Sequence, residues 1–287
     1  MSSVKQQRLR LSGGSELSFV TAGAPSSPAL LLLHGFPSSS RMFREVIPGL
    51  AQTAYVIAPD LPGHGRSDPL PAPSFAAFGA AITELLDHLA IKRRFIYLHD
   101  FGAPVGLQIA MQSPEQVCGL IIQNANAHRT GFGPQWQATL AYWHRPSPEN
   151  EAAATTHLTF AGVRDQYTAG VPEDVTARIK GEPWVEDWEV MRLPGRMETQ
   201  RALVADYANH VARFDAIADY LALWQPPALM LWGRHDAFFD LAETLSWMQA
   251  LPRMEAHIFD AGHFLLETHA EAALALMASF LKRGARV

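Results

Sequence analysis

Six short runs of apolar residues recur along the chain, and most of them are nearly continuous rather than alternating. Such runs are typical of strands that are buried on both faces, as in a parallel sheet. Two weaker runs, Arg8–Leu11 and Leu17–Thr21, flank Gly13-Gly14, which is the pattern of a leading hairpin. The six strong runs are Ala29–Leu33, Ala54–Ala58, Phe95–Leu98, Gly119–Gln123, Ala228–Trp232 and Glu255–Phe259.

Stretches with apolar residues at helical spacing lie between these runs. They are Ser74–Leu89, Phe101–Met111, which stops before Ser113-Pro114, and Glu271–Lys282, which closes the chain. Alternation of strand and helix predicts an α/β fold with a mostly parallel central sheet flanked by helices on both faces.

The alternation stops between residues 126 and 227. Five of the chain's seven tryptophans lie in this segment, which shows little strand signal. We interpret it as a mostly helical cap, or lid, inserted into the α/β core. The predicted division is therefore a core of residues 1–125 and 228–287 and a cap of residues 126–227.

Candidate catalytic residues follow the predicted strands. Ligands of parallel α/β sheets bind beyond the carboxyl ends of the strands. Asp100 follows the third strong run, Asp236 the fifth and His263 the sixth. Two carboxylates and a histidine are thus expected together at one edge of the sheet.

The junction at Asp100 is the sharpest of these. A helix begins almost at once after the strand, and the small residues Gly102 and Ala103 suit a tight strand–turn–helix. This is the form of a nucleophile elbow, with Asp where hydrolases of esters carry Ser. Backbone N–H groups at the start of the following helix can hold negative charge there.

The chain resembles the α/β-hydrolase superfamily, whose nucleophile–acid–base order matches Asp100, Asp236 and His263. The aspartate elbow resembles the epoxide hydrolase and haloalkane dehalogenase branches. The resemblance extends over residues 30–281 and includes His-Gly-Phe-Pro, Leu-Trp-Gly-Arg-His-Asp and Ala-Gly-His-Phe. It implies that Asp100 is the nucleophile and that His263, oriented by Asp236, activates water.

An aspartate nucleophile indicates a particular kind of electrophile. A carboxylate that attacks an ester carbonyl forms a high-energy anhydride, whereas attack on a saturated carbon forms a stable alkyl ester. Asp100 therefore favours displacement at sp3 carbon, in an epoxide or a carbon–halogen bond. Water then attacks the carbonyl carbon of Asp100, and by the resemblance the backbone N–H groups of Phe36 and Phe101 form the oxyanion hole.

The two branches differ in how they stabilise the leaving group. By the resemblance, epoxide hydrolases protonate the opened ring oxygen with one or two lid tyrosines, and haloalkane dehalogenases bind halide through a tryptophan beside the nucleophile. Phe101 and Phe36 stand where dehalogenases carry Trp and Asn, which favours an epoxide hydrolase giving vicinal diols. Tyr142 and Tyr207 have the spacing of the lid tyrosines, and Tyr167 is a third candidate.

A dehalogenase is the alternative. The chain also resembles fluoroacetate dehalogenases, but these bind the substrate carboxylate through arginines that Phe101–Val105 lacks. Tyr142, Trp143 and Tyr207 could still form a halide pocket. For either reaction we expect water and a small apolar organic substrate, bound among mostly apolar walls that include His34, Trp143 and Phe264.

Composition narrows the remaining possibilities. The 287 residues are 48% hydrophobic and carry a net charge of −5, with a pI of about 6.2. No basic stripe favours nucleic acid, no long apolar run favours a membrane, and a single cysteine excludes an internal disulfide. We expect a cytoplasmic enzyme with no metal or other cofactor, with a homodimer as one possible assembly. An esterase or lyase conflicts with the chemistry of Asp100, and a non-catalytic receptor for a small ligand would leave the full catalytic set unused.

Overall fold

The computed structural model describes residues 4–284 and contains an eight-stranded sheet in the order β1-β2-β4-β3-β5-β6-β7-β8. β1 and β2 run antiparallel to their neighbours, and the other pairs are parallel. The predicted α/β fold and its leading hairpin are thereby confirmed. The strands are β1 (Lys5–Arg10), β2 (Glu16–Ala22), β3 (Ala29–Leu33), β4 (Tyr55–Pro59), β5 (Arg94–His99), β6 (Val117–Gln123), β7 (Ala228–Gly233) and β8 (Glu255–Phe259).

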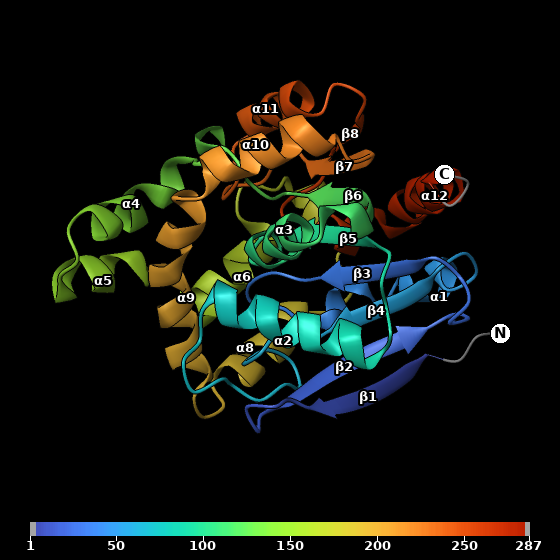
Figure 1. The fold of residues 1–287 in the computed structure, drawn as a ribbon. Coiled ribbons are helices and arrows are strands. Elements are labelled where there is room, and N and C mark those ends of the chain that lie inside the picture. Colours follow the sequence, from blue (N-terminus) through green and yellow to red (C-terminus); the bar gives the residue numbers. More distant parts are fainter. Residues whose placement is uncertain (1–3, 285–287) are drawn as a thin grey trace.

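Helices cover both faces of the sheet (Figure 1). Side chains alternate along each strand, so the sheet contributes to two cores: Leu31 and Leu33 of β3 face one, and Leu30 and Leu32 face the other. The second core is closed by α1 (Ile47–Leu50) and α12 (Leu266–Gly284). The first is closed by α2 (Phe75–His88), α3 (Gly102–Gln112), α10 (Phe214–Trp224) and α11 (Ala242–Ala250).

Helix boundaries follow from local chemistry in α2 and from packing in α12. The Ser74 side chain accepts a hydrogen bond from the Ala77 N–H at 3.1 Å and so caps α2 where the sequence predicts its start. The helix expected over Glu271–Lys282 is present, and a further helical turn precedes it. Helical structure begins at Leu266, which is buried in the core, and continues through a non-helical residue at His269.

The segment between β6 and β7, residues 126–227, is helical as expected, and we call it the insertion. In Figure 1 its helices α4, α5 and α9 lie beside the sheet, at the side toward which β3 points. Its last helix, α10, instead packs on α3 and α11 and so belongs to the layer that covers the sheet. The other helices are α4 (Gln137–His144), α5 (Pro148–Ala154), α6 (Phe160–Thr168), α7 (Glu173–Thr176), α8 (Pro183–Met191) and α9 (Arg196–Val211).

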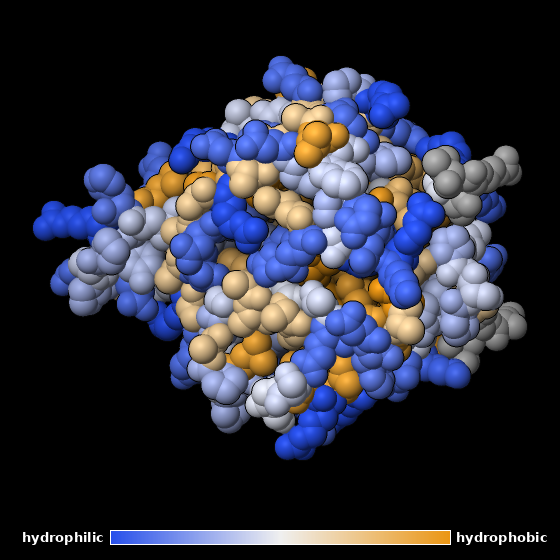
Figure 2. Space-filling view, in the orientation of Figure 1, coloured by the Kyte–Doolittle hydropathy of each residue, from blue (hydrophilic) through white to orange (hydrophobic). Residues whose placement is uncertain are grey.

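The surface of the described chain is mixed in character. Figure 2 shows that hydrophobic side chains on this face occur in separate areas between polar ones. Within residues 4–284 no helix is both long enough and apolar enough to cross a membrane. A homodimer stays a prediction.

Candidate active site

Asp100 occupies the tight turn between β5 and α3. Its φ angle of 46° lies in the left-handed region, a strained conformation for a residue with a side chain that is found mainly at functional sites. Its neighbours approach very closely. A Cβ atom on Gly102 would lie 2.5 Å from the Leu33 carbonyl oxygen, and one on Gly35 would lie 2.2 Å from the Asp100 Cβ. Glycine at both positions therefore allows this elbow to form.

The Asp100 carboxylate is held by two backbone N–H groups. The Phe36 N–H donates to Asp100 Oδ1 at 2.6 Å, and the Phe101 N–H also bonds to this carboxylate. Burial raises the pKa of the Asp100 carboxyl above its ordinary value, although His263 and the two N–H groups lower it in part. The same two donors are placed to stabilise an oxyanion that develops on this group.

His263 lies between the two carboxylates. Its Nδ1 is 2.9 Å from Asp236 Oδ2, and its Nε2 is 4.0 Å from Asp100 Oδ2. No residue of the described chain forms a hydrogen bond with Nε2. Burial lowers the pKa of His263, but the Asp236 and Asp100 carboxylates reverse this and raise the pKa above its ordinary value. The arrangement suits a base that Asp236 orients through Nδ1–H.

Asn124, which follows β6, holds the Asp236 carboxylate in place. Its Nδ2 donates to Asp236 Oδ2 at 2.8 Å and to the Gly233 carbonyl at 3.1 Å, and its Oδ1 accepts from the Gly233 N–H at 2.9 Å. The Phe238 N–H donates to Asp236 Oδ1 at 2.7 Å. Sequence reasoning missed Asn124, although a polar residue directly after an apolar strand, at the edge where the other candidates lie, was an available signal.

His99 packs against the ring of His263. The His99 and His263 ring centroids are 4.5 Å apart, and burial lowers the pKa of His99 well below its ordinary value. Gln123 donates from Nε2 to the His263 carbonyl at 2.9 Å. A neutral ring and a backbone hydrogen bond thus support the position of His263 from the side of the sheet.

A cavity of about 380 Å³ lies over Asp100. Phe36, Phe101 and Phe238 of the core line it, and the rest of the wall comes from the insertion. This wall carries more hydrogen-bonding groups than the apolar surroundings expected from the sequence. The insertion residues are Pro134, Gln135, Trp136, Gln137, Ala138, Thr139, Ala153, Ala154, Thr156, His157, Gln166, Val204 and Tyr207.

Tyr207 of α9 is the predicted lid tyrosine that reaches the cavity. It is fully buried, and its hydroxyl donates to Asn126 Oδ1. Burial and the nearby Asp100 raise the pKa of this phenol well above its ordinary value of 10. Tyr207 is therefore a neutral hydroxyl in the same wall as the carboxylate.

The comparison with known proteins agrees with this geometry. A family model described as the alpha/beta hydrolase fold matches residues 28–270. The chain belongs to this family. An uncharacterized hydrolase of Saccharomyces cerevisiae is 32% identical over 92% of this chain and 93% of its own length. A haloalkane dehalogenase of Mycobacterium marinum is 25% identical over 78% of this chain and 74% of its own. The solved epoxide hydrolase CorEH superposes with a TM-score of 0.79 at 23% identity, covering 98% of this chain and 99% of that one, which is a likeness of fold.

The prediction that Tyr142 lines the pocket of this α/β hydrolase is wrong. The cavity reaches residues 134–139, which include only the first turn of α4, and Tyr142 lies one turn further on. Trp143 does not line the cavity either. Its indole N–H donates to the Val204 carbonyl at 2.8 Å, and its ring stacks on Tyr207 with centroids 5.9 Å apart. Tyr207, rather than Trp143, therefore lines the cavity.

His34 and Phe264, which were also expected beside the substrate, lie outside the cavity wall. His34 is fully buried, and its Nε2 accepts from the Leu61 N–H at 2.8 Å, which braces the loop before Phe36. Phe264 packs edge-on against His263 and stacks on Tyr167 with centroids 4.0 Å apart. Both residues support the site from behind.

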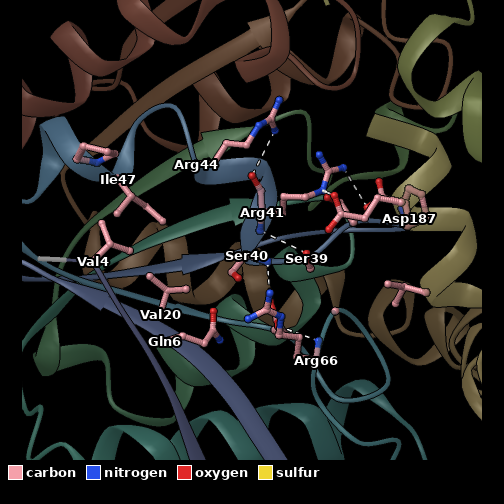
Figure 3. Close-up of a pocket in the computed structure, with 17 residues that line it drawn as sticks. Val4, Gln6, Val20, Ser39, Ser40, Arg41, Arg44, Ile47, Arg66 and Asp187 are labelled. Atoms are coloured by element: carbon pink, nitrogen blue, oxygen red, sulfur yellow. Dashed lines mark hydrogen bonds and ion pairs between the residues drawn. The ribbon is translucent and has the colours of Figure 1, made fainter. Parts of the chain in front are cut away.

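A partly buried ionic contact joins the insertion to the short 3-10 helix Ser40–Phe43, which follows Phe36 in the core. Arg41 donates from Nη2 to Asp187 Oδ1 at 3.1 Å (Figure 3). The same Nη2 donates to the Pro183 carbonyl at 2.9 Å. Tyr167, the third candidate lid tyrosine, donates its hydroxyl to the other oxygen of Asp187. Tyr167 therefore has a role in holding α6 and α8 over the core and does not line the cavity.

A metal site requires a cluster of side chains that can bind the ion. Within residues 4–284 no three or more His, Cys, Asp or Glu side chains form a group that could hold a metal ion.

Proposed function

We propose that this α/β hydrolase converts epoxides to vicinal diols through an alkyl ester on Asp100. The observation that carries the proposal is that a carboxylate at a nucleophile elbow and a neutral phenol, Tyr207, line the same cavity. The carboxylate suits attack on saturated carbon, and the phenol suits protonation of the oxygen that leaves it.

The reaction has two steps. An Asp100 oxygen forms a bond to one oxirane carbon, the carbon–oxygen bond of the ring breaks, and the alkoxide takes the Tyr207 proton. His263 Nε2 then removes a proton from water, which attacks the Asp100 carbonyl carbon while the Phe36 and Phe101 N–H groups hold the oxyanion. Collapse releases the diol and the carboxylate. The proton on His263 returns to the Tyr207 phenolate, so the sum is epoxide plus water giving diol.

Asn126 controls whether the phenol proton is available. In the structure Tyr207 donates it to Asn126 Oδ1. Rotation of the Asn126 amide would turn Nδ2 toward the phenol oxygen, because amide oxygen and nitrogen occupy equivalent places at the end of the side chain. The amide would then donate, and the Tyr207 proton would be free to bond with the substrate oxygen.

Two features of the cavity weigh against a dehalogenase. The indole N–H of Trp136, which lines the cavity, donates to the Phe238 carbonyl at 2.6 Å, and that of Trp143 also bonds to a carbonyl. Neither indole is therefore free to bind halide. Among the described residues no Arg or Lys lines the cavity, so a haloacetate carboxylate would find no cation.

The test is a parallel measurement of diol and halide. Purified protein would be incubated with aryl and alkyl epoxides, haloalkanes and haloacetates. We expect diol without halide, and no diol from Asp100→Asn. Asp240→Asn is the matched control, since Asp240 Oδ1 accepts a hydrogen bond from the Ala242 N–H at 2.8 Å, away from the cavity. Halide release with epoxides untouched would instead make the protein a dehalogenase.

A further inference from the structure

The cavity contains buried polar groups that the reaction above does not use. Gln166 of α6 is 5% exposed and Thr139 of α4 is 8% exposed, and both line the cavity. Within residues 4–284 neither side chain forms a hydrogen bond with another group of the protein. The polar atoms of these two side chains are not among the fully buried atoms that lack a partner, so they are open to hydrogen bonds with water or with a molecule bound in the cavity.

The cavity wall is polar but carries little charge. Among residues 4–284, Asp100 is the only Asp, Glu, Lys or Arg that lines it. His157 also lines the wall, and burial lowers its pKa to about 4, so its ring is neutral near pH 7. An anionic substrate would meet the Asp100 carboxylate and no compensating cation.

We propose that Gln166 and Thr139 recognise an uncharged hydrogen-bonding group, such as a hydroxyl, ether or amide, that the substrate carries away from its reacting carbon. Asp100 and Tyr207 act on the reactive end, and the insertion wall binds the other end. The substrate class is then a neutral polar epoxide rather than a purely apolar one. The identity of the reactive end rests on the proposed function, whereas recognition of the polar end does not.

The test compares three substrates of equal length on each protein variant. They are a terminal alkyl epoxide, the same molecule with its far methyl group replaced by hydroxyl, and the same chain ending in carboxylate. The quantity of interest is the ratio of kcat/KM for the hydroxyl and alkyl members. We expect Gln166→Leu to lower this ratio by about tenfold, as loss of one hydrogen bond implies. We expect a smaller decrease with Thr139→Val and the lowest kcat/KM for the carboxylate.

Gln112→Leu is the matched control, because Gln112 is exposed at the end of α3 and the substitution is the same. It should leave the ratio unchanged. An equal ratio in wild type, Gln166→Leu and Thr139→Val would overturn the inference, as would a preference for the carboxylate. Thr139→Val is nearly isosteric, so it provides the answer if Gln166→Leu does not fold.

Failure of the proposed function can be recognised separately. If only carbon–halogen bonds are cleaved, the same ratio is measured with chloroalkane and chloroalcohol pairs. Calorimetric dissociation constants of the alkyl diol and of its hydroxyl-bearing counterpart require no turnover at all. Tighter binding of the latter, weakened by Gln166→Leu, supports the inference; identical binding of both in both variants refutes it.

Discussion

Replacement of the base should separate the two chemical steps. His263→Gln removes the imidazole that lies 4.0 Å from the Asp100 carboxylate, which the mechanism assigns to water activation, but leaves Asp100 and its two N–H donors in position. A general base contributes about 10²–10⁴-fold to rate. Diol turnover should therefore fall by about that factor, while formation of the ester continues. The ester on Asp100 should then accumulate to one equivalent.

The substitution should not unfold the protein. Asp236 loses the Nδ1–H bond of 2.9 Å but keeps donors from Asn124 and from the Phe238 backbone. Loss of one buried hydrogen-bond partner costs about 1–3 kcal/mol, against a total stability of about 5–15 kcal/mol for typical domains. A thermal melt should show a modest decrease and a single cooperative transition.

The assay is intact-protein mass spectrometry after incubation with epoxide, followed by peptide mapping. His263→Gln should gain the mass of one epoxide on the peptide that contains Asp100. His257→Gln is the control, since His257 lies in β8 and pairs with Glu255 at 2.8 Å; it should turn over normally. Slow diol formation with no adduct, or an adduct on another residue, would refute the covalent mechanism.

Three further outcomes follow from the same geometry. Tyr207→Phe should lower kcat for epoxides by about 10²–10⁴-fold, the usual size of general-acid catalysis; an unchanged kcat would exclude Tyr207 as the proton donor. Asn124→Leu should destabilise the protein by about 1–3 kcal/mol for each buried group left unpaired, which a lower midpoint of thermal unfolding would show. It should also lower kcat more than it changes KM, because Asp236 no longer orients His263. An unaltered melt and kcat would contradict this. Activity requires ionised Asp100 and neutral His263, and the pKa of each group is raised. Activity should therefore fall as the pH drops through a value above the ordinary histidine pKa of 6.5, and no alkaline decrease is expected until Tyr207 ionises above pH 10. Full activity at about pH 4 would refute the assignment.

The sequence pattern was sufficient to predict the sheet and the order of the candidate catalytic residues along it. A strand buried on both faces must be apolar throughout, so the six runs were readable from local pattern alone. Because parallel strands end at one edge, Asp100, Asp236 and His263 could be placed together without knowledge of the packing. The elbow was readable for the same local reason, since only a small residue such as Gly102 fits there.

The tertiary structure alone decided which insertion residues face Asp100. The direction of a helical side chain depends on how the whole helix is docked, and that is set by contacts distant in sequence such as Arg41 with Asp187, which are 146 residues apart. Tyr142 and Tyr207 both had a spacing that suited a lid tyrosine, yet the cavity ends one turn before Tyr142. Gln166 carried no motif and became visible only through its burial in the cavity wall. Local patterns thus determined the catalytic edge, whereas the substrate wall required the packing of the insertion to be known.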